Sequence, residues 1–291
     1  MDWASEAETW PFSDNSRFVK HAPHEWHVQD LGDGPIAVLI HGTGGATQSF
    51  RNLVPRLAKH FRMIMVDLPG QGFTKMGTRQ RCGLHAMSDD LLSLMTAIGV
   101  EPDLYVAHSA GAAIALNMSR QNPTPVFGIN PALGHFDGAA GWLFPMLAKL
   151  LVLNPFVPGL FASMAKQPGR IEGLLKSTGS SLDPTGTDLY RRLITNRNHV
   201  DGALLMMAQW SIDGLLERLP EVAAPVFFLT AERDGAVPPK VAVKAAEQLS
   251  NATVKSIPGE GHLLHETAPD LTAQEILTFY ETCQSTGPSS A

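Results

Sequence analysis

Three residue types that together perform nucleophilic catalysis each stand in a short motif that follows a predicted strand. Ser109 lies in AHSAG, Asp234 lies in TAERDGAVP, and His262 ends PGEGH. A histidine can take the serine proton as a general base and later return it to the leaving group, while the acid orients the imidazole. The sequence therefore predicts a catalytic triad of Ser109, Asp234 and His262, in the chain order of a known hydrolytic arrangement.

The surroundings of Ser109 are typical of a nucleophile elbow, a sharp turn between a strand and a helix. Such a turn strains the serine and leaves its hydroxyl exposed above the sheet. Side chains two positions before and two positions after would collide there, and Ala107 and Gly111 are both small. A serine that only caps a helix is the plainer alternative. The joint presence of the other motifs favours the catalytic interpretation.

The glycine-rich segment HGTGG at 41–45 directly follows the strand-like run 36–40. Acyl transfer needs backbone N–H groups aimed at the developing oxyanion, and glycines let a loop approach the substrate closely. We expect the N–H of Ala110 to be one donor. Thr43 supplies the second, with Gly44 as a close alternative. The segment lacks the GKS or GKT ending of a phosphate-binding loop.

Composition excludes several other classes of protein. The 291 residues carry a net charge of −6 without a basic run, so we expect no nucleic-acid partner. Cys82 and Cys283 stand far apart, which indicates neither a disulfide framework nor a metal site, and we predict no metal and no cofactor. The N-terminus lacks the pattern of a signal peptide, and three prolines interrupt the apolar run 143–164. These features predict a cytoplasmic protein without a transmembrane span.

Alternating apolar runs and amphipathic segments predict an α/β fold with a mostly parallel central sheet flanked by helices. From about Pro131 to Pro220 the pattern becomes helical and rich in Met and Leu, which predicts an inserted helical cap. The expected parts are a core at 1–132, a cap at 133–219 and the rest of the core at 220–291. We expect a loosely held arm in the first 15 or so residues. Strands are expected at 26–31 (an edge strand), 36–40, 63–66, 104–107, 126–129, 226–229 and 254–257, and core helices at 50–60, 89–98, 110–120, 241–249 and 271–283.

The cap carries a flexible apolar surface that suits a large hydrophobic ligand, because methionine side chains adapt to irregular shapes. The same side chains could equally pack the cap onto the core. The residues expected to contact the substrate are Gly44, His108, Trp142, Phe144, Met146, Met206, Met207 and Trp210.

Together these motifs resemble the α/β-hydrolase superfamily over residues 25–132 and 220–283. The segment DLPGQG at 67–72 is similar to a loop that flanks the pocket in that superfamily, although Gln71 replaces a more common histidine. The resemblance also favours Asp234 over Glu232 as the acid, because Val-Pro follows shortly after it.

Other segments resemble a narrower branch, the magnesium-chelatase accessory α/β-hydrolases of bacteriochlorophyll biosynthesis. The matching stretches are HSAGAAI, NPAL, LNPFVP, STGSSLD and LMMAQW, most of them in the predicted cap. The resemblance implies a role in the magnesium branch of tetrapyrrole synthesis, with a porphyrin as ligand and magnesium-chelatase subunits as partners. Fold-level resemblance does not supply a reaction.

Three functions remain open at this point. The first is a serine hydrolase, an esterase acting on a hydrophobic ester such as a tetrapyrrole ester. The second is a non-catalytic tetrapyrrole-binding accessory protein of magnesium chelatase. The third is a carbon–carbon bond hydrolase, whose acidic substrates would need cations such as Arg191, Arg192 and Arg197, although a solvated helix face is their more ordinary use. An apolar cap surface also allows peripheral membrane contact. His265, beside Glu266, is expected to serve its loop or helix start and not to act as the base.

Overall fold

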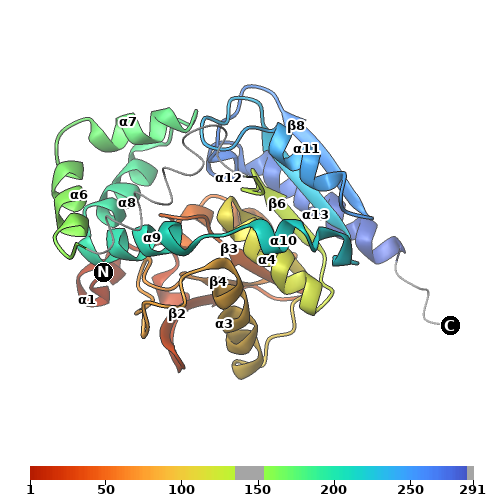
Figure 1. Ribbon diagram of the computed structural model, residues 1–291, viewed down its shortest axis with the longest axis horizontal. Coiled ribbons are helices and arrows are strands. Elements are labelled where there is room, and N and C mark those ends of the chain that lie inside the picture. The colour runs from red at the N-terminus through yellow and green to blue at the C-terminus, as the bar shows by residue number, and fades with distance from the viewer. Residues whose placement is uncertain (135–153, 287–291) are drawn as a thin grey trace.

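A computed structural model describes residues 1–134 and 154–286 of the chain (Figure 1). Its centre is an eight-stranded sheet in the order β1-β2-β4-β3-β5-β6-β7-β8. The strands from β4 to β8 along this order pair in parallel, whereas β1 and β2 are antiparallel to their neighbours. The strands are β1 Ser16–His21, β2 His24–Leu31, β3 Ile36–Ile40, β4 Arg62–Val66, β5 Leu104–His108, β6 Val126–Ile129, β7 Val226–Ala231 and β8 Ala252–Ile257. This architecture confirms the predicted fold class.

The inner strands are buried because helices cover both faces of the sheet. Successive residues of β3, such as Val38 and Leu39, are both fully buried, and they belong to separate apolar clusters on opposite faces. A parallel strand buried on both faces needs apolar residues without alternation, as the sequence has here. One cluster includes residues of α3 Leu84–Ala97, α4 Ala110–Gln121 and α11 Lys240–Ala246, together with residues of the helices that follow β6. The other cluster includes residues of α2 Val54–Leu57, α12 Leu264–Thr267 and α13 Pro269–Thr286.

The N-terminal part of the chain differs from expectation. Strand β2 lies inside the sheet, because β1 pairs with it along the whole length of β1 and forms the edge. The polar sequence of β1 does not predict a strand. The first 15 residues are not a loose arm. Trp10 is only 3% exposed and its Nε1–H donates to the hydroxyl of Thr47, while the guanidinium of Arg192 lies 5.4 Å from its ring. One aromatic anchor therefore holds the segment to the core and to a cap helix.

Among the core helices whose bounds differ from expectation, the first two along the chain differ most. The expected helix at 50–60 is a 3₁₀ turn, η3 Thr47–Phe50, followed by the short α2 that carries Pro55 in its first turn. Helix α3 begins at Leu84, five residues before the expected start, because Leu84 and Met87 are already buried in the core. Burial set by the tertiary fold outweighs local periodicity at both helices.

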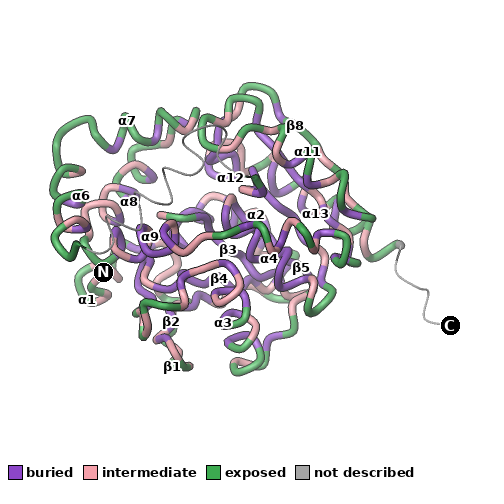
Figure 2. The backbone as a smooth tube through the Cα atoms, in the orientation of Figure 1, coloured by how far each residue is buried: buried purple, intermediate pink, exposed green. Residues whose placement is uncertain are grey.

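Between β6 and β7 the described chain forms helices and no strand. Figure 1 shows α6 to α9 grouped at one end of the molecule, with β8 and α13 at the other, and Figure 2 shows exposed residues along the outer sides of α6 and α7. The helices are α6 Val157–Ala165, α7 Arg170–Ser177, α8 Pro184–Ile194, α9 Arg197–Gln209 and α10 Asp213–Leu216. Within residues 1–134 and 154–286, no helix combines the length and the apolar character that crossing a bilayer requires.

Candidate active site

Ser109 occupies the sharp turn between β5 and α4. Its φ of 54° and ψ of −119° lie in a region that serine rarely adopts, and such strain is typical of functional turns. The N–H of Ser109 donates to the carbonyl of Ile129 at 2.9 Å, which fixes the turn to β6. A Cβ at Gly111 would lie 2.4 Å from the carbonyl oxygen of Ile40, so α4 can pack this close to β3 only with glycine at that position.

His262 connects the hydroxyl of Ser109 to the carboxylate of Asp234. Its Nδ1 lies 2.7 Å from Oδ2 of Asp234, and its Nε2 lies 3.1 Å from Oγ of Ser109. Because the carboxylate accepts the Nδ1 proton, the neutral ring presents a bare Nε2 that can accept the serine proton. The structure thus brings together three residues that the sequence separates by as many as 153 positions, in an arrangement able to activate a serine nucleophile.

The loop after β7 holds Asp234 in one orientation. The Asp234 side chain is fully buried, and its Oδ1 accepts the N–H groups of Ala236 and Val237 at 2.7 and 2.8 Å. Oδ2 then remains for His262. Glu232, the competing acid, is exposed to solvent. The geometry therefore favours Asp234 as the residue that orients the imidazole.

Two free backbone N–H groups flank Ser109. A Cβ at Gly42 would lie 2.9 Å from the Cβ of Ser109, so the 41–45 loop passes directly beside the serine. In the part of the chain that the structure describes, the N–H groups of Thr43 and Ala110 have no hydrogen-bond partner. The N–H of Gly44, the alternative donor, is already taken, because it donates to Oε1 of Gln71 at 2.7 Å. These contacts favour Thr43 and Ala110 as oxyanion donors.

Asn130 is a structural support of the site that the sequence did not reveal as such. Its side chain is buried at the end of β6 and connects the two loops that carry the acid and the base. Nδ2 donates to the carbonyls of Gly261 and His262 at 3.1 and 2.9 Å, and Oδ1 accepts the N–H of Ala231 at 2.8 Å. The motif NPAL contains this residue, but its amide contacts depend on residues 101 to 132 positions further along the chain.

Two further histidines lie behind the base. His108 is 5% exposed and its Nε2–H donates to the carbonyl of His262 at 2.9 Å, so it supports the backbone of the base, and we propose this role in place of substrate contact. The ring of His265 lies 4.4 Å from that of His108. Burial lowers the pKa of His265 to about 3 and the pKa of His108 well below its ordinary value. Both rings are therefore neutral at physiological pH and place no positive charge beside the base.

The predicted substrate contacts fall into separate groups. Met206 is fully buried, and its Sδ accepts the hydroxyl of Thr43 at 3.3 Å, which places it against the 41–45 loop. Met207 packs against the cap cluster of Ala162, Val200 and Leu204, and Trp210 packs against the main core cluster. Trp142, Phe144 and Met146 lie outside the described residues.

The three candidate cations of the cap have other partners. Arg191 pairs with Glu172 and Asp188, Arg192 pairs with Glu6, and Arg197 donates to the carbonyl of Pro155. None of these described contacts directs a guanidinium toward Ser109, so the geometry does not favour an acidic substrate held by them.

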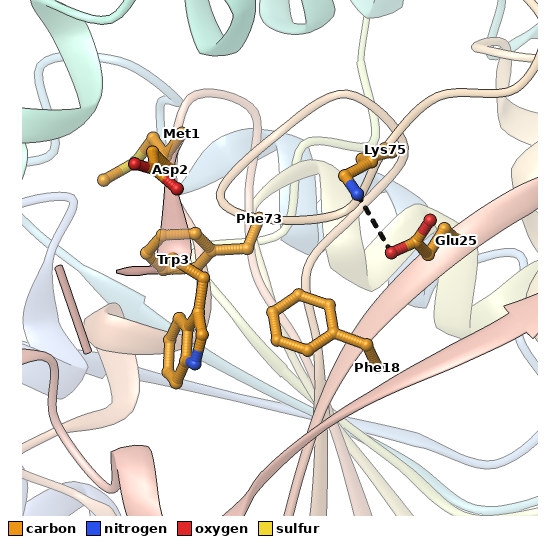
Figure 3. A pocket seen from close by; sticks show the side chains of 7 residues that line it. All are labelled: Met1, Asp2, Trp3, Phe18, Glu25, Phe73 and Lys75. Carbon is orange, nitrogen blue, oxygen red and sulfur yellow. Dashed lines mark hydrogen bonds and ion pairs between the residues drawn. The ribbon is translucent and has the colours of Figure 1, made fainter. Parts of the chain in front are cut away.

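A cavity of about 210 Å³ lies elsewhere, beside strands β1 and β2 (Figure 3). Three aromatic rings line it together with the ion pair of Lys75 and Glu25, and the Trp3 and Phe73 rings already pack edge to face at 4.8 Å. No residue of the predicted catalytic site lines it. Among the described residues, no group of three or more His, Cys, Asp or Glu side chains is placed to hold a metal ion.

Comparison with known proteins identifies the family of the chain. Residues 35–269 match the family described as "alpha/beta hydrolase fold". The chain is 42% identical to the magnesium-chelatase 30 kDa subunit of Rhodobacter capsulatus, over 97% of this chain and 100% of that protein. It is 26% identical to the pimeloyl-[acyl-carrier protein] methyl ester esterase of Pectobacterium carotovorum, over 87% and 97% of the two chains. A thermophilic esterase from Thermogutta terrifontis has a similar fold, with a TM-score of 0.71 at 19% identity over 92% of this chain and 98% of that one.

Proposed function

We propose that this chain, which belongs to the α/β-hydrolase family, is a serine hydrolase with esterase activity. Within the family it is similar to the magnesium-chelatase 30 kDa subunit of R. capsulatus. The observation that carries the proposal is the continuous hydrogen-bond path from Asp234 through His262 to a strained Ser109. Esterases among its relatives support the same class of reaction.

The proposed reaction has two steps, acylation of Ser109 and hydrolysis of the acyl-serine, and all three residues act in both. Oγ of Ser109 attacks the ester carbonyl while Nε2 of His262 takes its proton, and the oxyanion forms beside the N–H groups of Thr43 and Ala110. The His262 imidazolium, stabilised by Asp234, returns the proton to the alcohol that leaves. Water then attacks the acyl-serine and gives a proton to His262. His262 passes this proton to Oγ of Ser109 as the bond to the acyl group breaks, so the acid is released and Ser109 is restored.

The proposed substrate is a hydrophobic ester, and a tetrapyrrole ester is the specific candidate. Met206, which is fully buried beside the 41–45 loop, places an adaptable apolar side chain close to the nucleophile. The relative's name, a magnesium-chelatase subunit, supports association with magnesium-chelatase subunits. A cytoplasmic location and a role in bacteriochlorophyll synthesis are part of the same proposal.

A fluorophosphonate probe tests whether Ser109 is an activated nucleophile. We expect one probe per chain by intact mass in the wild-type protein and none in Ser109→Ala, which should also lose esterase turnover by about 10⁴-fold or more. Circular dichroism controls for the fold of the variant. Labelling of Ser109→Ala, or retained turnover in it, would rule out the serine mechanism.

A second candidate is a tetrapyrrole-binding accessory protein whose triad is not used. The 42% identity to a chelatase subunit is the observation that favours it. Complementation distinguishes the two candidates: a deletion strain that Ser109→Ala restores as well as the wild type would support binding alone. Failure of a stably expressed Ser109→Ala to restore the strain would support the hydrolase.

A further inference from the structure

Both backbone groups of Gly44 are held by side chains from outside its loop. The N–H donates to Oε1 of Gln71 at 2.7 Å, and the carbonyl lies 3.1 Å from Nε2 of His199. Gly44 has a φ of +79°, which glycine adopts without strain. With its two polar groups engaged on either side, the residue that follows Thr43 is fixed in one orientation.

The protonation of His199 is determined by its second contact. Its Nδ1 accepts the N–H of Gly72 at 3.0 Å, so the neutral ring carries its proton on Nε2 and donates it to Gly44. Burial lowers the pKa of His199 to about 4. A protonated ring would direct an Nδ1–H at the Gly72 N–H, so the contact requires the neutral form.

Helix α9 carries His199 and packs directly against the 41–45 loop and the 67–72 loop. A Cβ on Gly202 would lie 2.2 Å from the carbonyl oxygen of Gly70. The Sδ of Met206, one turn further along α9, accepts both the Thr43 hydroxyl and the Gln71 amide at 3.3 Å. Helix α9 therefore contacts the 41–45 loop at two points, the carbonyl of Gly44 and the hydroxyl of Thr43.

From these contacts we propose that His199 and Gln71 are positioning residues that clamp Gly44 and so orient the Thr43 N–H as the second oxyanion donor. The inference rests on the proposed hydrolase function and deepens it. The clamp uses the Gly44 N–H and leaves the Thr43 N–H for the substrate. It also makes α9 a part of the oxyanion site: displacement of the cap removes one side of the clamp.

Hydrolysis of p-nitrophenyl butyrate tests the role by comparing kcat with KM. Oxyanion donors act on the transition state, and loss of one costs about 10²–10³ in kcat. We expect His199→Ala and Gln71→Leu each to lower kcat by about 10-fold to 100-fold with KM changed by less than about 3-fold. Gln71→Glu keeps an acceptor for Gly44 but adds a negative charge beside the oxyanion, so kcat should fall although the bond is retained. Asn198→Ala, an exposed neighbour on α9, is the matched control.

Amide hydrogen exchange provides a readout that does not depend on turnover. Faster exchange over residues 41–45 in His199→Ala and Gln71→Leu, with partial recovery of both exchange and kcat in His199→Gln, is the expected result. The pH dependence of kcat should keep its midpoint in these variants, because a neutral positioning residue does not titrate near pH 7.

Two outcomes would overturn the inference and are distinguishable from each other. If the wild type hydrolyses the ester and its variants lose the exchange protection but keep kcat, the clamp does not orient a donor. If the wild type neither hydrolyses the ester nor reacts with the fluorophosphonate probe, the proposed function fails, and the positioning role fails with it.

Discussion

The buried amide of Asn130 connects the loops of the acid and the base by three hydrogen bonds. At φ 44° the backbone is in the left-handed region, which asparagine tolerates better than most residues. The position therefore needs an asparagine for two independent reasons, one in the backbone and one in the side chain. A role of this kind concerns the relative position of two loops and leaves the reacting atoms untouched.

Replacement of Asn130 by alanine should damage stability and reactivity together. Two buried carbonyls lose a donor and one buried N–H loses its acceptor, which we expect to cost about 2–3 kcal/mol in the free energy of unfolding. The rate of fluorophosphonate labelling should fall by about 10-fold or more as His262 shifts. Urea denaturation and labelling kinetics measure the two effects, with exposed Asn122→Ala as control. An unchanged labelling rate in a destabilised Asn130→Ala would show that the bridge supports only the fold.

The residues of the triad are predictable from sequence for a physical reason. Ser109, Asp234 and His262 each follow a predicted strand, and parallel strands deliver their following loops to one edge of the sheet. His199 gave no comparable signal. It is a single histidine on a methionine-rich helix, and its partner Gly44, 155 positions earlier, is determined by how the cap docks.

At the scale of elements, a buried ionic network attaches helix α8 to the core. Arg51, which follows η3, contacts Glu266 of α12 and Asp183 at the start of α8, while the Tyr190 hydroxyl donates to Glu266 at 2.8 Å. The side chain of Glu266 is fully buried, so its charge depends on Arg51 for compensation. A buried pair of this kind is costly to break by removal of one partner and much less costly to replace as a whole.

A double-mutant cycle tests this network. Arg51→Leu should lower the free energy of unfolding by about 3 kcal/mol, because it leaves the Glu266 carboxylate buried and unpaired. The double variant Arg51→Leu with Glu266→Leu should recover at least half of that loss. Arg56→Leu, which breaks an exposed pair with Asp270, serves as control and should cost far less, because solvent screens an exposed pair. Additive losses in the double variant would contradict the network.

Buried elements are predicted more accurately from the sequence than exposed elements. Strand β6 has the predicted bounds because all four of its residues are buried, three of them apolar and the fourth a glycine. Strand β1 was missed because its exposed sequence SRFVKH carries little apolar pattern, although pairing with β2 makes it a strand. Local sequence shows which residues avoid water, and it shows less of what a polar segment pairs with.

At the scale of the whole molecule, buried neutral histidines make stability depend on pH. Burial lowers the pKa of His199 to about 4 and that of His265 to about 3, and it lowers the pKa of His108 as well. Below about pH 6.5 the unfolded chain binds protons that the folded chain does not bind. The stability that these groups contribute is therefore complete above about pH 6.5 and is lost as the pH falls toward 4.

His265→Leu should reduce this loss in acid. Each such proton contributes up to about 1.4 kcal/mol per pH unit, and neither ring nitrogen of His265 has a hydrogen-bond partner among the described residues. Urea denaturation between pH 7.5 and pH 4.5 should show a shallower decline for the variant, with His60→Gln, at an exposed position, as control. An unchanged slope would show that His265 does not resist protonation in the folded state.

The outer side of the cap predicts peripheral contact with an anionic membrane. Phe156 and Leu160 are 81% and 58% exposed, and the exposed cations Lys166 and Arg170 follow them in the chain. We expect the protein to sediment with vesicles of phosphatidylcholine and phosphatidylglycerol, less so at high salt, and less so as Phe156→Ser with Leu160→Gln. Val243→Gln, on the exposed face of α11, is the control. Equal sedimentation of both variants would show that α6 makes no lipid contact.

The contact between Gly70 and Gly202 also limits how this protein can be recombined. Two backbones meet there with no room for a Cβ on either. A chimera that receives residues 154–219 from a relative must therefore bring a glycine to position 202, along with the histidine at 199. A donor segment with alanine at 202 would hold the whole insertion away from the nucleophile. Substrate range in this branch is thus expected to change by substitutions within the existing cap more readily than by exchange of the cap as a module.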